Sequence, residues 1–385
     1  MVFTNHLISC QKAVSDEVGI INTLTRMARH NEDPKYRVYA AAACNTEFLS
    51  GEKFAGQCSG IGIDWKEAVL STVGETLERY SSTFYNLEEA VYEEYVNLEN
   101  AIAPSEFAIF HPEQLKSERF KATLFDENTK VHWFKCNDLV NEGKEVLCPG
   151  AFLYLPFNAD DAFITQTTST GLAAHVDVHK AMLSGIYELV ERDSFMITWF
   201  QKIIPPKIVI DEDIQNFINE IFPPNYELHL FDITTDLGIP SVIGFCVGEA
   251  DFGPFIMPGA ASRGTIGEAV KKTIVEIAQG FPYFRNFLLD KNKDWNPVNF
   301  HEVNDFPEHG VFYTIRKDLQ FVLQPFLEAK ESKKINFLER DNDVPAEEIK
   351  KLIKKFKAKD YNLLFRDLTT PDAVSYTHLT LPTKA

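Results

Sequence analysis

The chain has 385 residues, of which 45% are hydrophobic, so it can bury a large core in one domain or two. Its formal net charge is −18 at pH 7, a field that repels nucleic acid and anionic membrane surfaces. No run of 18 apolar residues occurs, so we expect a soluble, cytoplasmic protein with no nucleic-acid partner and no membrane partner.

The first part of the chain alternates short periodic segments with loops. We expect a helix over residues 15–30, a strand over 36–43, and a glycine-rich loop over 51–62. A strongly periodic helix follows from Asp64 to about Phe84. The acidic and aromatic residues 88–109 are typical of a surface helix and loop.

The second part continues with mixed strands and helices. We expect strands at residues 131–136, 145–154, 227–231, 241–247 and 361–366, helices at 177–201, 265–279 and 346–356, a polar turn region at 158–171, and a surface connection at 290–305. This mixture has no clean division into an all-helical and an all-strand part. It predicts an α/β or mixed α+β architecture.

Three segments divide the chain. Residues 1–50 are expected to supply an N-terminal helix and strand to the same unit, and residues 51–375 to form the main domain. Residues 376–385 carry no helix or strand period and resemble translated adapter sequence. We therefore expect the native C-terminus to be missing, which leaves the catalytic residues unassigned.

One nine-residue pattern, Ser-x3-Glu-x2-Glu-Arg, occurs twice in the sequence. Aligned without gaps at a spacing of 113, residues 64–81 and 177–194 are identical at eight positions: Asp64/Asp177, Ala68/Ala181, Leu70/Leu183, Ser71/Ser184, Glu75/Glu188, Glu78/Glu191, Arg79/Arg192 and Ser81/Ser194. Each aspartate stands where it can cap the first turn of a helix. Because the carboxylates are duplicated in register, the pattern favours a functional site over the alternative of a solvated, charged helix face.

The spacing of this pattern places its polar side chains on one face. Ser71, Glu75 and Glu78 stand at i, i+4 and i+7, within roughly 60° of one another on a helix. Ser184, Glu188 and Glu191 stand likewise. Apolar neighbours flank both stripes, where an unpaired charge is costly. Carboxylate oxygens gathered in this way suit Mg²⁺, and Mg²⁺ suits ATP phosphates.

A third helix shares this frame. Aligning Ala269 with Ala68 places Glu276 at the Glu75 position and Gln279 at the Glu78 position, with Thr265 at the N-cap. We expect the three helices to surround one polar cavity.

The stretches that carry the repeat resemble the signature of the YcaO family. They are SGIGIDWKEAVLSTVGETLERY at residues 59–80, TGLAA at 170–174 and AMLSGIYELVERD at 181–193. The resemblance covers roughly residues 50–372. It implies a YcaO-type fold with internally repeated strand-helix units around a central nucleotide cavity. It also implies ATP and Mg²⁺ as cofactors without a Walker A loop, and the chain has no G-x4-G-K-[ST] motif.

The resemblance further implies a reaction. ATP-dependent YcaO enzymes activate backbone amides of ribosomally made precursor peptides. Residues 131–154, and the second motif continued through Trp199, most resemble the cyclodehydratases of thiazole/oxazole-modified microcin and bacteriocin biosynthesis. These form thiazoline or oxazoline rings from Cys, Ser or Thr. The alternatives are a thioamide- or amidine-forming enzyme and a nucleotide-binding scaffold without catalysis. The expected partners are the precursor peptide and a leader-binding E1-like, ocin-type protein, and a homodimer is an option that the sequence leaves open.

Carried over by motif position, the family's site residues fall on the three helices and the first glycine-rich loop. The metal ligands implied are Glu75, Glu78, Glu188 and Glu191. The nucleotide-binding residues implied are Ser59, Gly60, Ser71, Arg79, Ser184, Arg192, Glu276 and Gln279. The planar fork of arginine suits phosphate because it gives paired, charge-assisted hydrogen bonds.

Departures from the family pattern concern the same site. Ile61 stands where the family often has lysine, and Gln279 is followed by Tyr283 and Arg285 instead of by arginine four residues on. Azole-forming members tend to end in a proline-rich segment near the active site, whereas the given sequence ends in the adapter-like residues 376–385.

Other candidate sites are weaker. His175 and His179 have the spacing of zinc ligands, but no third ligand is apparent and Asp177 is better explained as a cap. The turn at residues 169–171 could hold a phosphate. The six cysteines contain no C-x-x-C pair, which predicts reduced, mostly buried thiols instead of a zinc ribbon or disulfide scaffold.

Overall fold

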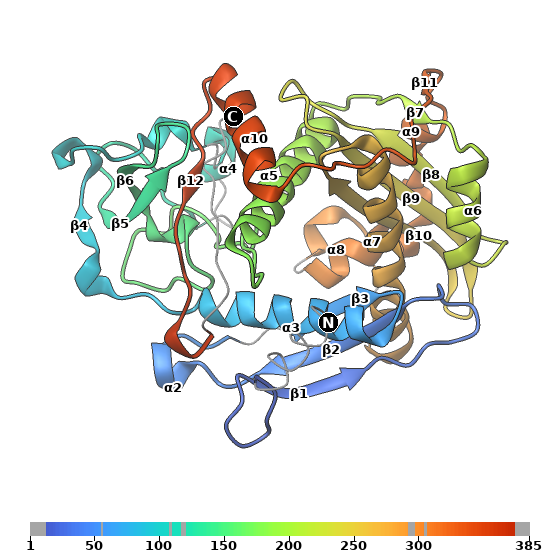
Figure 1. Ribbon diagram of the computed structural model, residues 1–385, viewed down its shortest axis with the longest axis horizontal. Coiled ribbons are helices and arrows are strands. Elements are labelled where there is room, and N and C mark those ends of the chain that lie inside the picture. The colour runs from blue at the N-terminus through green and yellow to red at the C-terminus, as the bar shows by residue number, and fades with distance from the viewer. Residues whose placement is uncertain are drawn as a thin grey trace.

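The computed structural model describes residues 13–54, 57–107, 110–116, 121–291, 297–303 and 306–373. The expected adapter-like tail at residues 376–385 and part of the expected connection at 290–305 lie outside these ranges. The described residues form three β-sheets joined by helices, so the mixed α/β class predicted from the sequence is confirmed (Figure 1).

The first sheet is antiparallel, in the order β1-β2-β3, and the first motif helix packs on it. Its elements are β1 (Ile21–Arg26), β2 (Arg37–Ala43), β3 (Gln57–Gly62), the short α2 (Glu47–Ser50) and the helix α3 (Trp65–Ser81). The helix predicted over residues 15–30 is wrong, because Ile21–Arg26 pairs with β2. Its β-branched residues favour an extended chain once a partner strand is present.

The second half of the predicted glycine-rich loop is also a strand, β3. A Cβ atom at Gly60 would lie 2.2 Å from the backbone nitrogen of Thr72, and one at Gly62 would lie 2.4 Å from that of Ala68. The two glycines therefore let β3 run directly beneath α3. Their absence of side chains serves this close packing.

A five-stranded sheet forms the right-hand side of the molecule in Figure 1. Its order is β10 (Gly253–Ser262), β9 (Ser241–Ala250), β8 (Glu227–Asp232), β7 (Lys207–Ile208) and β11 (Ser332–Lys333). The helix α7 (Ile266–Asn286) packs against β9 and β10, and α6 (Glu212–Ile221) lies beside the sheet. The core between them includes Val270, Ile274, Ile277 and Phe281, all less than 1% exposed, so α7 is fixed along its length.

The third sheet consists of β4 (Val91–Glu93), β5 (Val131–Asp138), β6 (Lys144–Pro149) and β12 (Leu364–Phe365), and α4 (Pro112–Leu115) belongs to the same region. β4 and short 3-10 turns take the place of the surface helix predicted within residues 88–109. Trp133 and Phe134 are fully buried in an aromatic core that holds this sheet together.

The remaining helices connect the sheets. α5 (Val178–Phe200) crosses the centre, and α10 (Pro345–Ala358) packs along it through Ile349, Leu352 and Phe356 (Figure 1). α8 (Phe306–Ile315) contacts β10, and α9 (Gln324–Leu327) follows. After β12 the chain returns to α3, where Tyr80 donates a hydrogen bond to Asp372. No described helix combines the length and apolar character needed to span a membrane.

Candidate nucleotide and metal site

The two motif helices begin as predicted. The carboxylate of Asp64 accepts hydrogen bonds from the backbone N–H groups of Lys66 and Glu67, at 2.8 and 3.0 Å. Asp177 caps α5 in the same way, through the N–H groups of His179 and Lys180. Caps of this kind satisfy donors that the first turn leaves unpaired. They fix the rotation of each helix and hence the direction of its glutamate stripe.

In the first copy, the glutamates of α3 are tied to β3 and to their own arginine. Glu75 Oε2 accepts a hydrogen bond from the backbone N–H of Ser59 at 2.9 Å. Arg79 lies 3.6 Å from Glu75 and 3.5 Å from Glu78. The side chains of Arg79 and Glu78 are only 18% and 14% exposed. The first copy is thus a largely buried cluster of charges.

The second copy repeats these contacts on α5. Glu188 Oε2 accepts a hydrogen bond from the backbone N–H of Gly171 at 3.3 Å. Arg192 lies 3.4 Å from Glu188 and 3.5 Å from Glu191. Its side chain is 50% exposed, so the arginine of this copy is more open than Arg79, whereas Glu188 and Glu191 are only 24% and 17% exposed.

The third helix, α7, brings its predicted residues to the same place. Thr265 caps it by accepting from the N–H of Glu268 at 3.3 Å. Gln279 Nε2 donates to Ser59 Oγ at 3.2 Å, which joins α7 to the strand before α3. Glu276 is paired with Lys272 at 2.5 Å.

The charges of the three helices influence one another. Burial raises the pKa of Glu78 well above its ordinary value; Arg79 opposes this, and Glu188 and Glu75 add to it. Burial also raises the pKa of Glu191 to about 8, with Arg192 opposing and Glu276 contributing. Burial thus favours the neutral form of these carboxylates, and a bound cation would favour the ionised form, since four glutamates of α3 and α5 share two arginines.

Glu276 behaves differently from the other glutamates. Burial alone would raise its pKa, but Lys272 and Arg263 together outweigh that effect, and its pKa is lowered. Glu276 is therefore the most readily ionised carboxylate of the group.

The glutamates of α3 and α5 suit Mg²⁺ when it is bound together with a polyphosphate. In the described part of the chain, no three His, Cys, Asp or Glu side chains are gathered closely enough to hold a metal by themselves. Mg²⁺ does not require such a cage, because it is usually held by one or two carboxylates, water and substrate phosphates. Carboxylates from two facing helices, with arginines beside them, fit a metal that arrives together with a polyphosphate. The predicted metal ligands remain a prediction.

The other predicted nucleotide-binding residues lie along the same helices. Ser71 and Ser184 are exposed, as a residue that contacts a ligand from the rim would be. Gly60 is buried under α3, so the structure gives it a packing reason. Its predicted contact with the nucleotide, like the central cavity itself, is untested.

Sequence reasoning missed two cations of the site. Lys272 is four residues before Glu276 on α7, a spacing that could have revealed the pair. Arg263 lies just before the α7 cap, and folding brings Glu191 of α5 close to it, in addition to Glu276 and Glu268 of α7. No local signal identifies it.

The weaker candidates do not gain support. Nδ1 of His175 accepts a hydrogen bond from the N–H of Asp177, and no described cluster includes the ligands that zinc would need. Cys44, Cys58, Cys136, Cys148 and Cys246 are free, and all but Cys44 are buried. Burial raises the pKa of Cys58 to about 12, which makes it a poor nucleophile.

A comparison with family models matches residues 59–382 to the family described as YcaO cyclodehydratase, ATP- and Mg²⁺-binding. This range covers more than half of the chain and contains both motif copies and the third helix. No significant match was found among curated proteins.

Solved structures show the same fold. A heterocyclase in complex with substrate and cofactor superposes with a TM-score of 0.79 at 19% identity, over 99% of this chain and 52% of that one. YcaO from Methanopyrus kandleri, bound with AMPPCP and Mg²⁺, gives 0.71 at 16% identity, over 100% and 91%. The Escherichia coli microcin synthetase McbBCD complex gives 0.58 at 14% identity, over 86% and 80%. The present chain spans about half of the length of the first of these proteins.

Proposed function

Because this chain belongs to the YcaO family, which binds ATP and Mg²⁺, we propose that it is an ATP-dependent cyclodehydratase acting on a ribosomally made precursor peptide. One observation supports this most: charged residues of both motif copies are electrostatic neighbours, since Arg79 and Glu78 of α3 both interact with Glu188 of α5. Two separate sites would not need this juxtaposition.

The proposed roles follow from the contacts. Glu75, Glu78, Glu188 and Glu191 hold Mg²⁺. Their buried, under-neutralised charge explains why a cation is needed. Bound Mg-ATP supplies the phosphoryl group that turns an amide oxygen into a leaving group. Arg79, Arg192 and Gln279 orient phosphate oxygens, with Ser71, Ser184 and Glu276 at the edge of the site.

The proposed reaction is a net dehydration of the peptide. A Cys, Ser or Thr side chain of the substrate adds to the preceding amide carbonyl carbon and loses its proton. The resulting oxyanion takes the γ-phosphoryl group of ATP, which leaves ADP. Loss of the amide N–H proton and of phosphate then forms the C=N bond. Peptide and ATP become azoline peptide, ADP and phosphate, so the oxygen of the lost water ends in phosphate.

A separate leader-binding protein is part of this proposal. The E. coli relative is an assembly, McbBCD, and it has also been solved with pro-MccB17 bound. The heterocyclase solved with its substrate is about twice as long as the region that this chain matches. We infer that a partner of the E1-like, ocin type delivers the peptide to this chain.

The test combines the chain with Mg-ATP, a Cys/Ser/Thr-rich peptide encoded beside its gene, and the neighbouring leader-binding protein. Mass spectrometry should show the loss of one water per ring, with one phosphate released per ring. The Glu188→Gln variant, which keeps the side-chain shape, should show neither change. A gain in mass that depends on added sulfide would instead support thioamide formation. Absence of ATP turnover in every such combination would overturn the proposal.

A further inference from the structure

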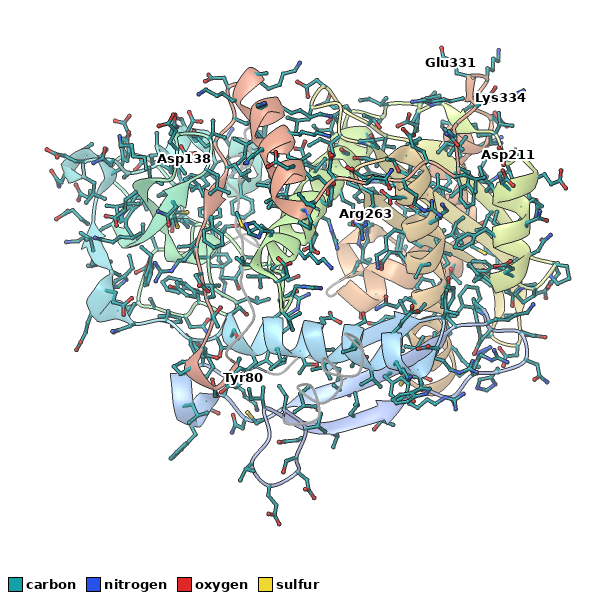
Figure 2. All side chains as sticks on the ribbon, viewed as in Figure 1. Tyr80, Asp138, Asp211, Arg263, Glu331 and Lys334 are labelled. Carbon is teal, nitrogen blue, oxygen red and sulfur yellow. The ribbon has the colours of Figure 1, made fainter. Side chains whose placement is uncertain are left out.

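Arg263 is a half-buried cation between two of the site helices, and it lies outside both copies of Ser-x3-Glu-x2-Glu-Arg. It lies between the end of β10 and the Thr265 cap of α7. Figure 2 shows Arg263 in the space between α5 and α7. Its Nη1 donates to the carbonyl oxygen of Ser262 at 2.6 Å, and its guanidinium carbon lies 5.8 Å from the ring centre of Tyr187 on α5.

These two contacts leave most of the guanidinium unused. In the described part of the chain, Arg263 has no carboxylate within ion-pair distance, whereas Arg79, Arg192 and Lys272 each have at least one. Its electrostatic neighbours are nevertheless Glu191, Glu276 and Glu268. A guanidinium has five N–H donors in a planar fork, and among the described residues only Ser262 accepts a hydrogen bond from it. The free edge of the fork suits an anion.

The surrounding helix lacks any other arginine that could do this. Gly280 stands where the alignment with α3 would place the equivalent of Arg79, and Tyr283 stands where the family has arginine. Arg285 is committed elsewhere, since it pairs with Asp33 and Asp251, each at 2.7 Å. Among the arginines of residues 263–286, Arg263 is therefore the one that lies near the glutamates of the site.

We propose that Arg263 binds a phosphate oxygen of the Mg²⁺-bound nucleotide from the α5–α7 side, held in position by the ring of Tyr187 and the carbonyl of Ser262. This inference rests on the proposed function, because it places the nucleotide among the glutamates. The guanidinium lies near both Glu191 and Glu276. It is therefore placed to contact a phosphate oxygen of a nucleotide whose Mg²⁺ these helices hold. The two carboxylates repel an unaccompanied phosphate, and the arginine offsets that repulsion.

The test measures two ligands on one variant, Arg263→Gln. Calorimetry with Mg-AMPPCP should show affinity weakened about tenfold or more, which corresponds to about 1.4 kcal/mol per tenfold. Mn²⁺ alone, followed by electron paramagnetic resonance, should bind more tightly than to the unchanged protein, because a positive charge has left the neighbourhood of Glu191 and Glu276. Arg263→Lys should recover only part of the Mg-AMPPCP affinity, because lysine lacks the fork.

One matched variant controls for structure. Lys271 of α7 is also a half-buried cation that contacts a carbonyl oxygen and a ring, both of Phe337, and Lys271→Gln should leave Mg-AMPPCP affinity unchanged. Tyr187→Leu, which removes the ring beside Arg263, should bind Mg-AMPPCP more weakly.

Each remaining outcome has a definite meaning. If Arg263→Gln strengthens the binding of Mn²⁺ and Mg-AMPPCP alike, Arg263 only balances charge and the inference is overturned. Unchanged Mg-AMPPCP affinity in Arg263→Gln also overturns it, including the case where the arginine contacts the peptide. If the unchanged protein binds no Mg-AMPPCP, the proposed function itself fails, and this assignment fails with it.

Discussion

The two copies of the motif have identical signature residues but different surroundings. In the first copy, Ser59 and Gly60 belong to a strand of a sheet that lies beneath α3, and Arg79 is 18% exposed. In the second copy, an irregular loop supplies Gly171, and α5 packs against α10 while its Arg192 is 50% exposed. The glutamates of the two copies are thus buried to a similar extent, and the copies differ in the exposure of their arginines.

This difference should affect the stability of the domain and leave the role of the residues in ligand binding unchanged. Arg79 is enclosed together with the glutamates that it pairs with, so we expect it to contribute to the stability of the domain as well as to the site. Arg192 is half exposed, so water can partly replace it beside its glutamates. Substitutions at equivalent positions should therefore affect ligand binding alike and stability unequally.

The largest expected effect is on turnover, and it should be equal in both copies. Glu75→Gln and Glu188→Gln each remove a charged oxygen that we assign to Mg²⁺. Each should lower ATP-dependent phosphate release about 100-fold or more, the scale of a lost preorganised charge. A coupled phosphate assay checks this. If one variant retained normal turnover, the copies would not share one site.

Substitution of the two arginines should affect stability unequally. Arg79→Gln leaves Glu75 and Glu78 buried without their partner, which should cost roughly 3 kcal/mol in the free energy of unfolding. Arg192→Gln should cost less than Arg79→Gln, because the guanidinium of Arg192 is half exposed and water can partly replace it. Urea denaturation at pH 7.5 measures both. Equal losses would mean that the burial difference between the copies has no energetic consequence.

The packing beneath the helices offers a further contrast. Gly60→Ala places a Cβ against the backbone nitrogen of Thr72 and should destabilise the protein by about 1–3 kcal/mol. At the spacing of 113, the residue of the second copy that corresponds to Gly60 is Ala173. A Cβ atom is therefore already accommodated at this position, although Ala173 is only 3% exposed.

The smallest expected effect concerns the ligand-free protein and pH. The pKa of Glu191 is raised by burial to about 8. Between its unfolded pKa, near 4.5, and about 8, the unfolded chain is ionised at this position while the folded chain holds its proton. Stability therefore falls as pH rises through this window. Glu191→Gln removes this loss and should raise the melting temperature by a few degrees at pH 7.5 and not at pH 4. A lower melting temperature at pH 7.5 would contradict this interpretation.

Local patterns predicted the parts of the fold that carry the motifs. The caps at Asp64, Asp177 and Thr265 and the three amphipathic helices depend on residues within a few positions of one another, and all three caps are present. The helix predicted over residues 15–30 failed for the opposite reason. Residues of β1 form a strand because β2 lies beside them, and no local signal contains that pairing.

The site shows the same division. Spacing alone identified the glutamates and Gln279. It could not identify Arg263, whose neighbours Tyr187 and Glu191 are more than 70 residues away in the sequence. Nor could it reveal that Arg285 is committed to Asp33 and Asp251, because three separate segments meet there. Long-range charges decide which arginine is available to a ligand.

The central claim is that both copies build one site, and the stoichiometry of nucleotide binding tests it most directly. Calorimetric titration of the full chain with Mg-AMPPCP should give one nucleotide per chain. Glu75→Gln and Glu188→Gln should each weaken that same binding event. Two nucleotides per chain, with each variant removing one of them and leaving the other intact, would show that the copies are independent sites and would contradict the account.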